Sequence, residues 1–217
     1  MHKVYRNLLS ETELLAIEQA ARAYRSNDAW SDSISVGTSY DSISANSSRI
    51  AKSILIRPQD IPIAIRDKIN AAAVDVQSGN YYFNEAWSIQ RYLDIDGGKF
   101  DWHADTLRFF KYHKGDEKLD AEDIFRRNTV PERAISVSIA LNDREEYEGG
   151  QFIIDYGDGA KWPVDLDRGD ACIFTSDTFH GVEPVTNGVR DALIIWLVNY
   201  EDYVRWLELC DIDIEKV

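Results

Sequence analysis

The sequence contains little cysteine, with only Cys172 and Cys210 among its 217 residues. A disulfide framework or a C-x-x-C zinc site needs more cysteines at closer spacing, so both thiols are expected to be reduced. No apolar run approaches the roughly 20 residues that span a bilayer. The N-terminal segment also lacks the apolar core and small-residue cleavage site of a signal peptide. These absences predict a cytoplasmic protein that does not insert into a membrane.

Basic residues are also few, because 24 Lys and Arg stand against 38 Asp and Glu, for a formal net charge of −14. Proteins hold nucleic acid and anionic membrane surfaces through clustered Lys and Arg, and no such cluster stands out here. The acidity argues against both partners and is better explained by solubility. With 44% hydrophobic residues, the composition is typical of one globular domain with a sizeable core.

The first eighty residues predict a helical support. Ser10 and Glu13 fit a capping box, and the apolar residues after them recur at helical spacing. The expected elements are, in order, a helix over 10–25, a loop or irregular hairpin over 26–47, a strand over 48–58 and a helix over 59–78. Both helices are expected to pack on the outer face of a sheet.

From Tyr81 onwards the apolar pattern changes to the period of two that indicates strands. Turns rich in Asp and Gly separate the strand candidates, which are 81–95, 98–105, 133–141, 149–155, 161–166, 171–176, 180–185 and 190–200. This series after a helical segment predicts a mainly β fold with flanking helices. The specific expectation is a double-stranded β-helix (jelly-roll) core with the N-terminal helices packed on one sheet.

The expected layout is a single domain over 1–217, with helical support over 1–80, a jelly-roll core over 81–200 and a C-terminal segment over 201–217. A charged insertion over 107–132 interrupts the core, and a connection of this length is more often a lid or binding loop than a passive one. His113 in this insertion is interpreted as a solvated histidine. Four of its side chains could reach a substrate or belong to a solvated basic loop: Arg108, Phe110, Arg126 and Arg127.

Two of the four histidines lie in strand-like segments. Residues two apart in a strand share a face, so His103 and Asp105 offer a nitrogen and a carboxylate side by side. His180 is a candidate third ligand from a later strand. Two His and one carboxylate on one side of a metal leave the other positions open, as in non-haem Fe(II) oxygenases. The alternative is an H-x-D pair that arises by chance in an Asp-rich chain.

Three sequence blocks stand in order between Tyr92 and Trp196. The first is a Tyr and a Gly-rich turn before H-x-D, which ends at Asp105. The second, over 133–154, is an Arg-led strand with an L-N step, Y-x-G-G and an apolar strand. The third is Gly-Asp and an apolar strand, then H-x-V-x-P-V-x-x-G-x-R over 180–190 and an aromatic residue. Together the blocks resemble the Fe(II)/2-oxoglutarate dioxygenases of the prolyl 4-hydroxylase type, especially the PKHD-type hydroxylases.

The resemblance implies a role for each candidate site residue. His103, Asp105 and His180 would hold Fe(II). Arg190 would form a bidentate ion pair with the distal carboxylate of 2-oxoglutarate, since its planar fork suits a carboxylate. Tyr92 would donate its hydroxyl to the co-substrate, with a plain core aromatic as the alternative.

One position departs from the pattern, because Ala140 stands where some prolyl hydroxylases carry a Tyr that assists the distal carboxylate. Ser138 or Tyr92 could assist Arg190 instead. If Asn187-Gly188 is a hairpin turn, Arg190 lies opposite Val185, about five residues or roughly 16 Å along the strand from His180. A five-carbon diacid and an extended Arg side chain together span about this distance.

The activity implied by the resemblance is hydroxylation of a C–H bond, coupled to oxidative decarboxylation of 2-oxoglutarate by O₂ to succinate and CO₂. Its cofactors would be Fe(II), 2-oxoglutarate and O₂, with ascorbate as an accessory reductant. A prolyl or other residue of a protein or peptide is the leading substrate class, and a free amino acid or small metabolite is the alternative. A non-catalytic jelly-roll domain that binds a metal or ligand, and a cupin-type zinc or manganese enzyme, are the other classes to test.

Overall fold

The structure is a computed structural model that describes residues 1–24, 31–32, 49–106 and 131–209. Its helices are α1 (Glu11–Tyr24), α2 (Ile63–Val76) and α5 (Tyr200–Leu209). Its strands are β1 (His2–Tyr5), β2 (Ser31–Asp32), β3 (Arg49–Ile50), β4 (Lys52–Ile56), β5 (Tyr81–Tyr82), β6 (Trp87–Leu93), β7 (Lys99–His103), β8 (Arg133–Ala140), β9 (Tyr147–Gly149), β10 (Phe152–Asp155), β11 (Lys161–Val164), β12 (Ala171–Thr175), β13 (His180–Val182) and β14 (Val185–Asn199).

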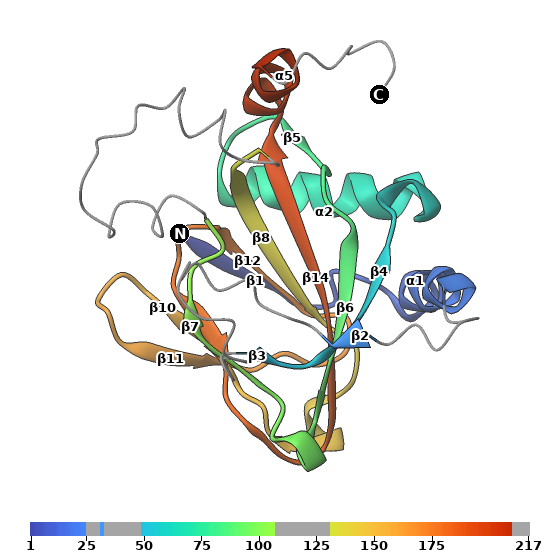
Figure 1. The fold of residues 1–217 in the computed structure, drawn as a ribbon, viewed down its shortest axis with the longest axis vertical. Helices are drawn as coiled ribbons and strands as arrows, with labels where there is room; N and C mark the ends of the chain where they lie inside the picture. Colours follow the sequence, from blue (N-terminus) through green and yellow to red (C-terminus); the bar gives the residue numbers. More distant parts are fainter. Residues whose placement is uncertain (25–30, 33–48, 107–130, 210–217) are drawn as a thin grey trace.

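The described strands form two antiparallel sheets (Figure 1). The larger has the order β1-β12-β8-β14-β6-β4-β2, with β5 and β9 also paired to β14. The smaller has the order β11-β10-β13-β7-β3. Apolar side chains of both sheets, such as Phe174 from β12 and Phe152 from β10, pack in one cluster between them. The fold is the predicted double-stranded β-helix, with helices on the outer face of one sheet.

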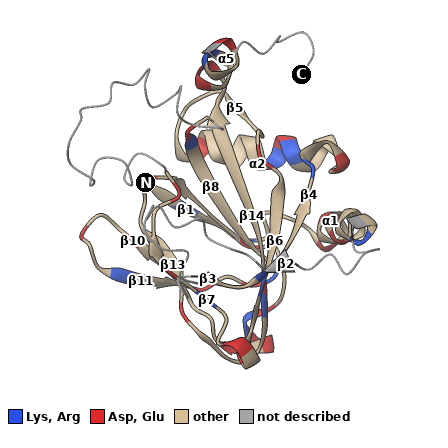
Figure 2. Cartoon of the chain, viewed as in Figure 1, with Lys and Arg blue, Asp and Glu red and all other residues tan. Residues whose placement is uncertain are grey.

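Strict alternation along the central strands decides which side chains face the helices. On β8, Ile135, Val137 and Ile139 belong to the core cluster that α1 and α2 complete, and all three are fully buried. Leu193 and Ile195 of β14 join the same cluster. The part of this face that packs against the helices is apolar, as a sheet face covered by amphipathic helices requires. In Figure 2 the charged positions gather on the helices and near strand ends.

The opposite face of the same strands is buried yet partly polar. On β8 the residues between the apolar ones are Ser136 and Ser138. Gln90 of β6 and Arg190 of β14 are also almost fully buried. Buried polar groups are costly unless they are paired or serve a ligand. The polar side of the large sheet therefore marks where a site lies. Cys172 is buried in this layer too, and burial raises the pKa of its thiol to about 12.

The helical predictions are confirmed in their type and placement. Helix α1 begins with the predicted capping box, since the backbone N–H of Ser10 donates to Glu13 Oε2 at 2.7 Å and the N–H of Glu13 to Ser10 Oγ at 3.4 Å. Helix α2 is shorter than the predicted 59–78, because Pro58–Asp60 form a 3₁₀ turn before it. Strand β1 was not predicted from the sequence.

The predicted strand over 48–58 is wrong as a single element. It divides into β3, which pairs with β7 in the small sheet, and β4, which pairs with β6 in the large one. The chain changes sheets at Ala51, between the two strands. The segment Tyr81–Ile95 is similarly divided into β5 and β6. The apolar pattern is continuous across both divisions, so it could not reveal them.

The predicted hairpin turn at Asn187-Gly188 is also wrong, because β14 runs through both residues. Gly188 has a φ of 81° and pairs with Tyr147 of β9, next to a register shift. Gly188 thus accommodates an irregular stretch of ladder that resembles a bulge. The partner of Arg190 across the sheet is accordingly Tyr92 on β6, not Val185.

The predicted lid lies almost entirely outside the described residues, together with His113, Arg108, Phe110, Arg126 and Arg127. The residues on either side of it are linked, since Thr106 Oγ1 donates a hydrogen bond to Glu132. Most of the loop predicted over 26–47 and the end of the C-terminal segment also lie outside the described part. Among the described helices, none is both long and apolar enough to cross a membrane.

Candidate metal centre and its pocket

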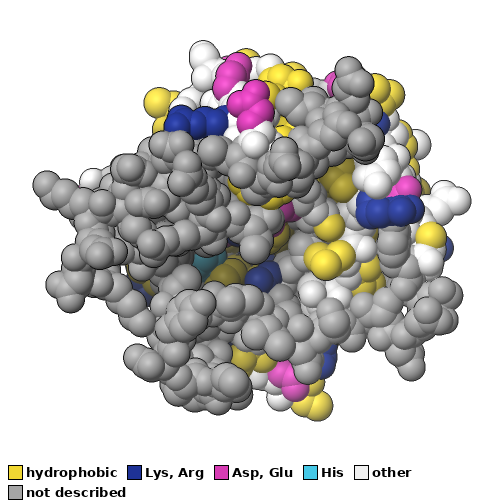
Figure 3. All heavy atoms as spheres, turned by 45° about the horizontal axis from the view of Figure 1, so that its top comes forward, with side chains coloured by type: hydrophobic (Ala, Val, Ile, Leu, Met, Phe, Trp, Pro, Cys, Tyr) yellow, Lys and Arg dark blue, Asp and Glu magenta, His cyan; other side chains and the backbone are white. Residues whose placement is uncertain are grey.

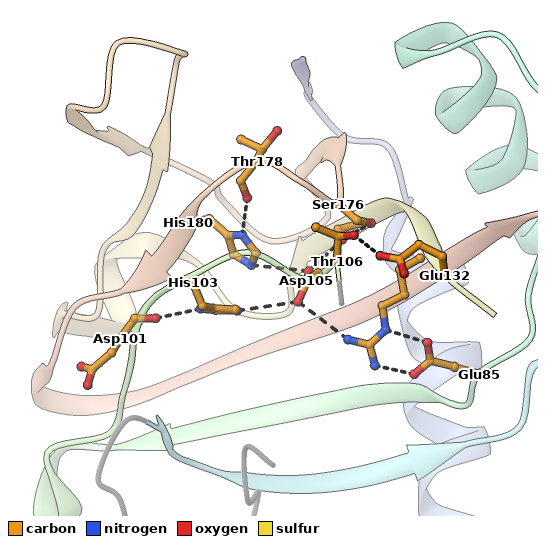
Figure 4. Close-up of polar contacts among 11 residues, drawn as sticks. Glu85, Asp101, His103, Asp105, Thr106, Glu132, Ser176, Thr178 and His180 are labelled. Atoms are coloured by element: carbon orange, nitrogen blue, oxygen red, sulfur yellow. Dashed lines mark hydrogen bonds and ion pairs between the residues drawn. The ribbon is translucent and has the colours of Figure 1, made fainter. Parts of the chain in front are cut away.

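The three predicted ligands lie together at one end of the small sheet (Figure 4). His103 ends β7 and His180 begins β13, and the two are direct partners across the ladder. Asp105 lies two residues beyond the strand end, where its backbone N–H donates to Ser176 O at 2.9 Å. The ligand atoms of the three side chains all lie within 4.8 Å of one another.

Each imidazole is oriented by a hydrogen bond from its inner nitrogen. His103 Nδ1 lies 2.7 Å from Asp101 O, and His180 Nδ1 lies 3.0 Å from Thr178 O. A carbonyl only accepts, so each Nδ1 carries the proton and each Nε2 has a free lone pair. His103 Nε2 is buried without a hydrogen-bond partner among the described residues. The donor set therefore fits a divalent metal such as Fe(II).

The protonation states of Asp105 and His180 favour the binding of a cation. Burial raises the pKa of Asp105, but the interactions with His180, His103 and Arg133 lower it by more. The pKa of Asp105 therefore lies well below its usual value. Burial lowers the pKa of His180 to about 4, although Asp105 opposes the shift. Asp105 is thus ionised and His180 neutral at pH 7, the forms that bind a metal.

Side chains behind Asp105 hold its carboxylate in place. Ser136 Oγ donates to Asp105 Oδ2 at 2.7 Å and lies 2.9 Å from Ser176 Oγ. Arg133 Nη1 lies 3.9 Å from Asp105 Oδ1, and Arg133 Nε donates to Glu85 at 2.6 Å. The Arg133 guanidinium also lies 3.7 Å from the ring centre of Trp196. Such partners behind a metal ligand fix its orientation.

Replacing Ser136 with alanine is expected to weaken metal binding by about 10- to 100-fold, because the carboxylate of Asp105 loses the donor that orients it. The measurement is the dissociation constant for Fe(II) under argon, with Mn(II) as a second probe. The matched control is Ser138→Ala, two residues along the same face of β8, where no hydrogen bond to Asp105 exists. Equal metal affinity in Ser136→Ala and the parent protein would contradict the orienting role.

A pocket of about 420 Å³, including the part open to solvent, adjoins the three side chains. Arg190, Tyr92 and Ser138 line it from the large sheet. Arg190 is only 4% exposed, and its Nη1 has no hydrogen-bond partner among the described residues. Ser138 Oγ is buried and unpartnered in the same sense. In Figure 3 a histidine and a Lys or Arg side chain are visible in a hollow of the surface.

Tyr92 contacts Arg190 through its ring, whose centre lies 5.3 Å from the guanidinium carbon. Cross-strand pairing places the two residues side by side. Tyr92 thus supports the guanidinium by a cation–π contact. This side of the pocket thus presents the guanidinium of Arg190 and the unpartnered hydroxyl of Ser138, and both can donate hydrogen bonds to a carboxylate.

The sequence predicted the three metal-binding candidates and Arg190 but missed three other side chains of the site: Arg49, Arg133 and Ser136. An irregular register between two strands also shapes the lining of the pocket. Between β7 and β13 the register shifts, so that His180 opposes His103 while Val182 opposes Phe100. As a result Phe100 and His103, three residues apart, both line the pocket. Simple alternation would have placed them on opposite faces.

Comparison with known families agrees with this geometry. Residues 87–198 match the 2OG-Fe(II) oxygenase superfamily. The matched segment contains all three candidate ligands and Arg190 and covers more than half of the chain. The chain therefore belongs to the 2OG-Fe(II) oxygenase superfamily.

Curated PKHD-type hydroxylases match part of the chain. A PKHD-type hydroxylase of Aliarcobacter butzleri is 33% identical over 102 residues, which are 47% of this chain and 39% of that protein. A PKHD-type hydroxylase of Xylella fastidiosa is 45% identical over 65 residues, 29% of this chain and 27% of the relative. The chain thus aligns with about a quarter to two fifths of the length of these relatives.

Solved structures show the same fold at low identity. A Trichoplax adhaerens prolyl hydroxylase has a TM-score of 0.63 and 14% identity, over 94% of this chain and 86% of that one. A Pseudomonas putida prolyl-4-hydroxylase has a TM-score of 0.58 and 16% identity, over 91% of this chain and 92% of that one. The predicted resemblance to the prolyl 4-hydroxylase and PKHD-type oxygenases is thereby confirmed.

Proposed function

We propose that this protein is an Fe(II)- and 2-oxoglutarate-dependent dioxygenase that hydroxylates a C–H bond. The observation that carries the proposal is a pocket with two ligand-binding ends. At one end His103 and His180 lie beside the ionised Asp105, and at the other the buried Arg190 has an Nη1 without a hydrogen-bond partner among the described residues. The described residues, with the remainder of 1–217, are proposed to form one oxygenase domain.

The roles of the metal ligands follow from their donor atoms. His103 Nε2, His180 Nε2 and a carboxylate oxygen of Asp105 would hold Fe(II), in the facial arrangement that leaves the remaining positions open. Bound iron would activate O₂ and couple decarboxylation of 2-oxoglutarate to succinate and CO₂ with hydroxylation of the substrate. The protein would orient both reactants, and the apolar side chains of Phe152 and Phe174 would keep water out of the pocket.

Arg190 would bind the distal carboxylate of 2-oxoglutarate. The guanidinium lies in the layer between the sheets, where a carboxylate can neutralise it and accept two N–H bonds. Ser138 is proposed as the helper that replaces the Tyr missing at Ala140, because its hydroxyl is buried and unused. Tyr92 would hold the guanidinium through its ring.

The leading substrate proposal is a prolyl or other residue of a protein or peptide. It is supported by the PKHD-type relatives and by the Trichoplax structure, which is described as a prolyl hydroxylase in complex with a peptide fragment of the hypoxia-inducible factor oxygen degradation domain. A free amino acid or small metabolite is the second candidate. The lining of the pocket is the observation that favours it, since apolar side chains of both sheets and a few polar ones surround a space that suits a small ligand.

The test is an anaerobic titration with Fe(II) and 2-oxoglutarate that monitors the metal-to-ligand charge-transfer band in the visible region. The parent protein is expected to show the band, and His103→Ala to lose it while remaining folded by circular dichroism. Oxygen added with ascorbate should then convert 2-oxoglutarate to succinate. A folded, metal-loaded parent without the band would contradict the proposal and favour a non-catalytic binding domain.

A further inference from the structure

A second guanidinium, that of Arg49, faces the same pocket from the other sheet. Arg49 lies on the edge strand β3 and is the direct cross-strand partner of Phe100. Its guanidinium carbon lies 4.6 Å from the ring centre of Phe100. Phe100 in turn stacks on His103, with ring centres 3.6 Å apart. One aromatic ring therefore separates the Arg49 guanidinium from a candidate metal ligand.

The charge of Arg49 has no acidic partner among the described residues. Its Nε is buried and makes no hydrogen bond there. Burial lowers the pKa of Arg49 from its usual value, and the more distant Asp105 and Tyr92 oppose this only in part. Five other arginines of the described chain lie within 4 Å of a carboxylate: Arg6, Arg57, Arg91, Arg133 and Arg168. Neither Arg49 nor Arg190 has such a partner among the described residues.

A half-buried arginine whose Nε is shielded from water and unpartnered is costly unless an anion arrives to pair with it. One anion, the distal carboxylate of 2-oxoglutarate, is already assigned to Arg190 on β14. Arg49 lies on β3 of the opposite sheet, where its guanidinium packs on Phe100 beside His103. The two cations are thus placed for two different anionic groups.

We propose that Arg49 binds a carboxylate of the substrate that the enzyme hydroxylates, and so selects acidic substrates. The assignment rests on the proposed function, because it places the substrate beside the metal centre. The guanidinium would hold the carboxylate by charge-assisted hydrogen bonds while Phe100 keeps its plane fixed. The carboxylate belongs to a free acid, such as an amino acid, or to an acidic side chain next to the reacting residue of a peptide.

The test is anaerobic calorimetry on the Fe(II)-loaded protein with saturating 2-oxoglutarate, so that Arg190 is occupied and no turnover occurs. One arm titrates the L-amino acids against their carboxamides, and the other titrates blocked Asp-Pro and Glu-Pro peptides against Asn-Pro and Gln-Pro peptides. The parent is expected to bind at least one acid about tenfold or more tightly than its amide. Arg49→Met should abolish this preference, and Arg49→Lys should retain part of it. The arm that shows the preference identifies the source of the carboxylate.

The matched control is Arg57→Met, because the Arg57 side chain is 64% exposed and pairs with Asp60 on the surface. It should leave every affinity unchanged. The proposal is overturned if no acid binds the parent more tightly than its amide, or if Arg49→Met keeps the preference. It is also overturned if Arg49→Met loses 2-oxoglutarate instead, which would assign Arg49 to the co-substrate. The charge-transfer band reports the proposed function separately, so failure of one leaves the other measurable.

Discussion

Replacing Arg190 with methionine is expected to weaken 2-oxoglutarate binding by roughly 30-fold to several thousand-fold, while Fe(II) still binds. Truncating one partner of a buried, hydrogen-bonded charge pair costs about 2–5 kcal/mol, and each 1.4 kcal/mol is a factor of ten. Arg190 is 4% exposed, so solvent cannot replace the lost partner. The measurement is the 2-oxoglutarate concentration at half-maximal charge-transfer absorbance, under argon with saturating Fe(II).

Two further variants locate the effect at Arg190. Arg190→Lys keeps the charge without the planar fork and should bind 2-oxoglutarate with intermediate affinity. Arg91→Met lies on the adjacent strand, where Arg91 pairs with Asp191 at 2.6 Å, and should leave the affinity unchanged. An Arg190→Met protein with the affinity of the parent would show that another residue holds the distal carboxylate.

The metal-free protein is expected to lose on the order of 2 kcal/mol of stability between pH 7 and pH 4.5 because of His180. Burial lowers the pKa of this imidazole from 6.5 to about 4. Between these values the unfolded chain binds a proton that the folded chain does not, so unfolding becomes easier as the pH falls. Asp105 acts in the same direction but at lower pH, because its pKa lies below the usual 3.8 and its stabilisation is lost mainly as the pH falls below about 4. Urea unfolding at several pH values measures the effect.

His180→Gln is the control for this linkage, because glutamine keeps a polar side chain but does not titrate. Its stability should change less over the same pH range, and the difference between the two proteins is the contribution of His180. His2 also has a pKa lowered by burial, but it is present in both proteins and cancels. Identical pH slopes for the parent and His180→Gln would contradict a neutral, buried imidazole.

The sequence was sufficient to predict which three candidate ligands come together, because strand alternation and motif spacing are local properties. His103 and Asp105 are two residues apart, and the third block carries both His180 and Arg190. The placement of Arg49 depended instead on a change of sheet at Ala51, which no local pattern reports. The polar residues Ser136 and Ser138, alternating with fully buried apolar ones, were an available signal of a site on that face.

The register of Arg190 could not be predicted for a similar reason. Asn-Gly favours a tight turn in isolation, but here long-range pairing with β9 keeps the chain extended through Gly188. A Cβ at Gly188 would lie 2.7 Å from Glu146 O, so the close approach of β9 also requires glycine. Glycine at position 188 is therefore needed for the contact between β14 and β9, which are distant in the sequence, and not for a hairpin turn.

The two arginines proposed to bind the co-substrate and the substrate lie on different sheets, and this affects how such enzymes can diversify. Arg190, the residue proposed to bind the co-substrate, lies in the middle of the large sheet, on a strand paired on both sides, where any change disturbs the core. Arg49 lies on a two-residue strand that pairs, among the described strands, with β7 alone at the edge of the small sheet. Substitution at position 49 could therefore change which substrates bind, while the candidate metal ligands and Arg190 stay the same.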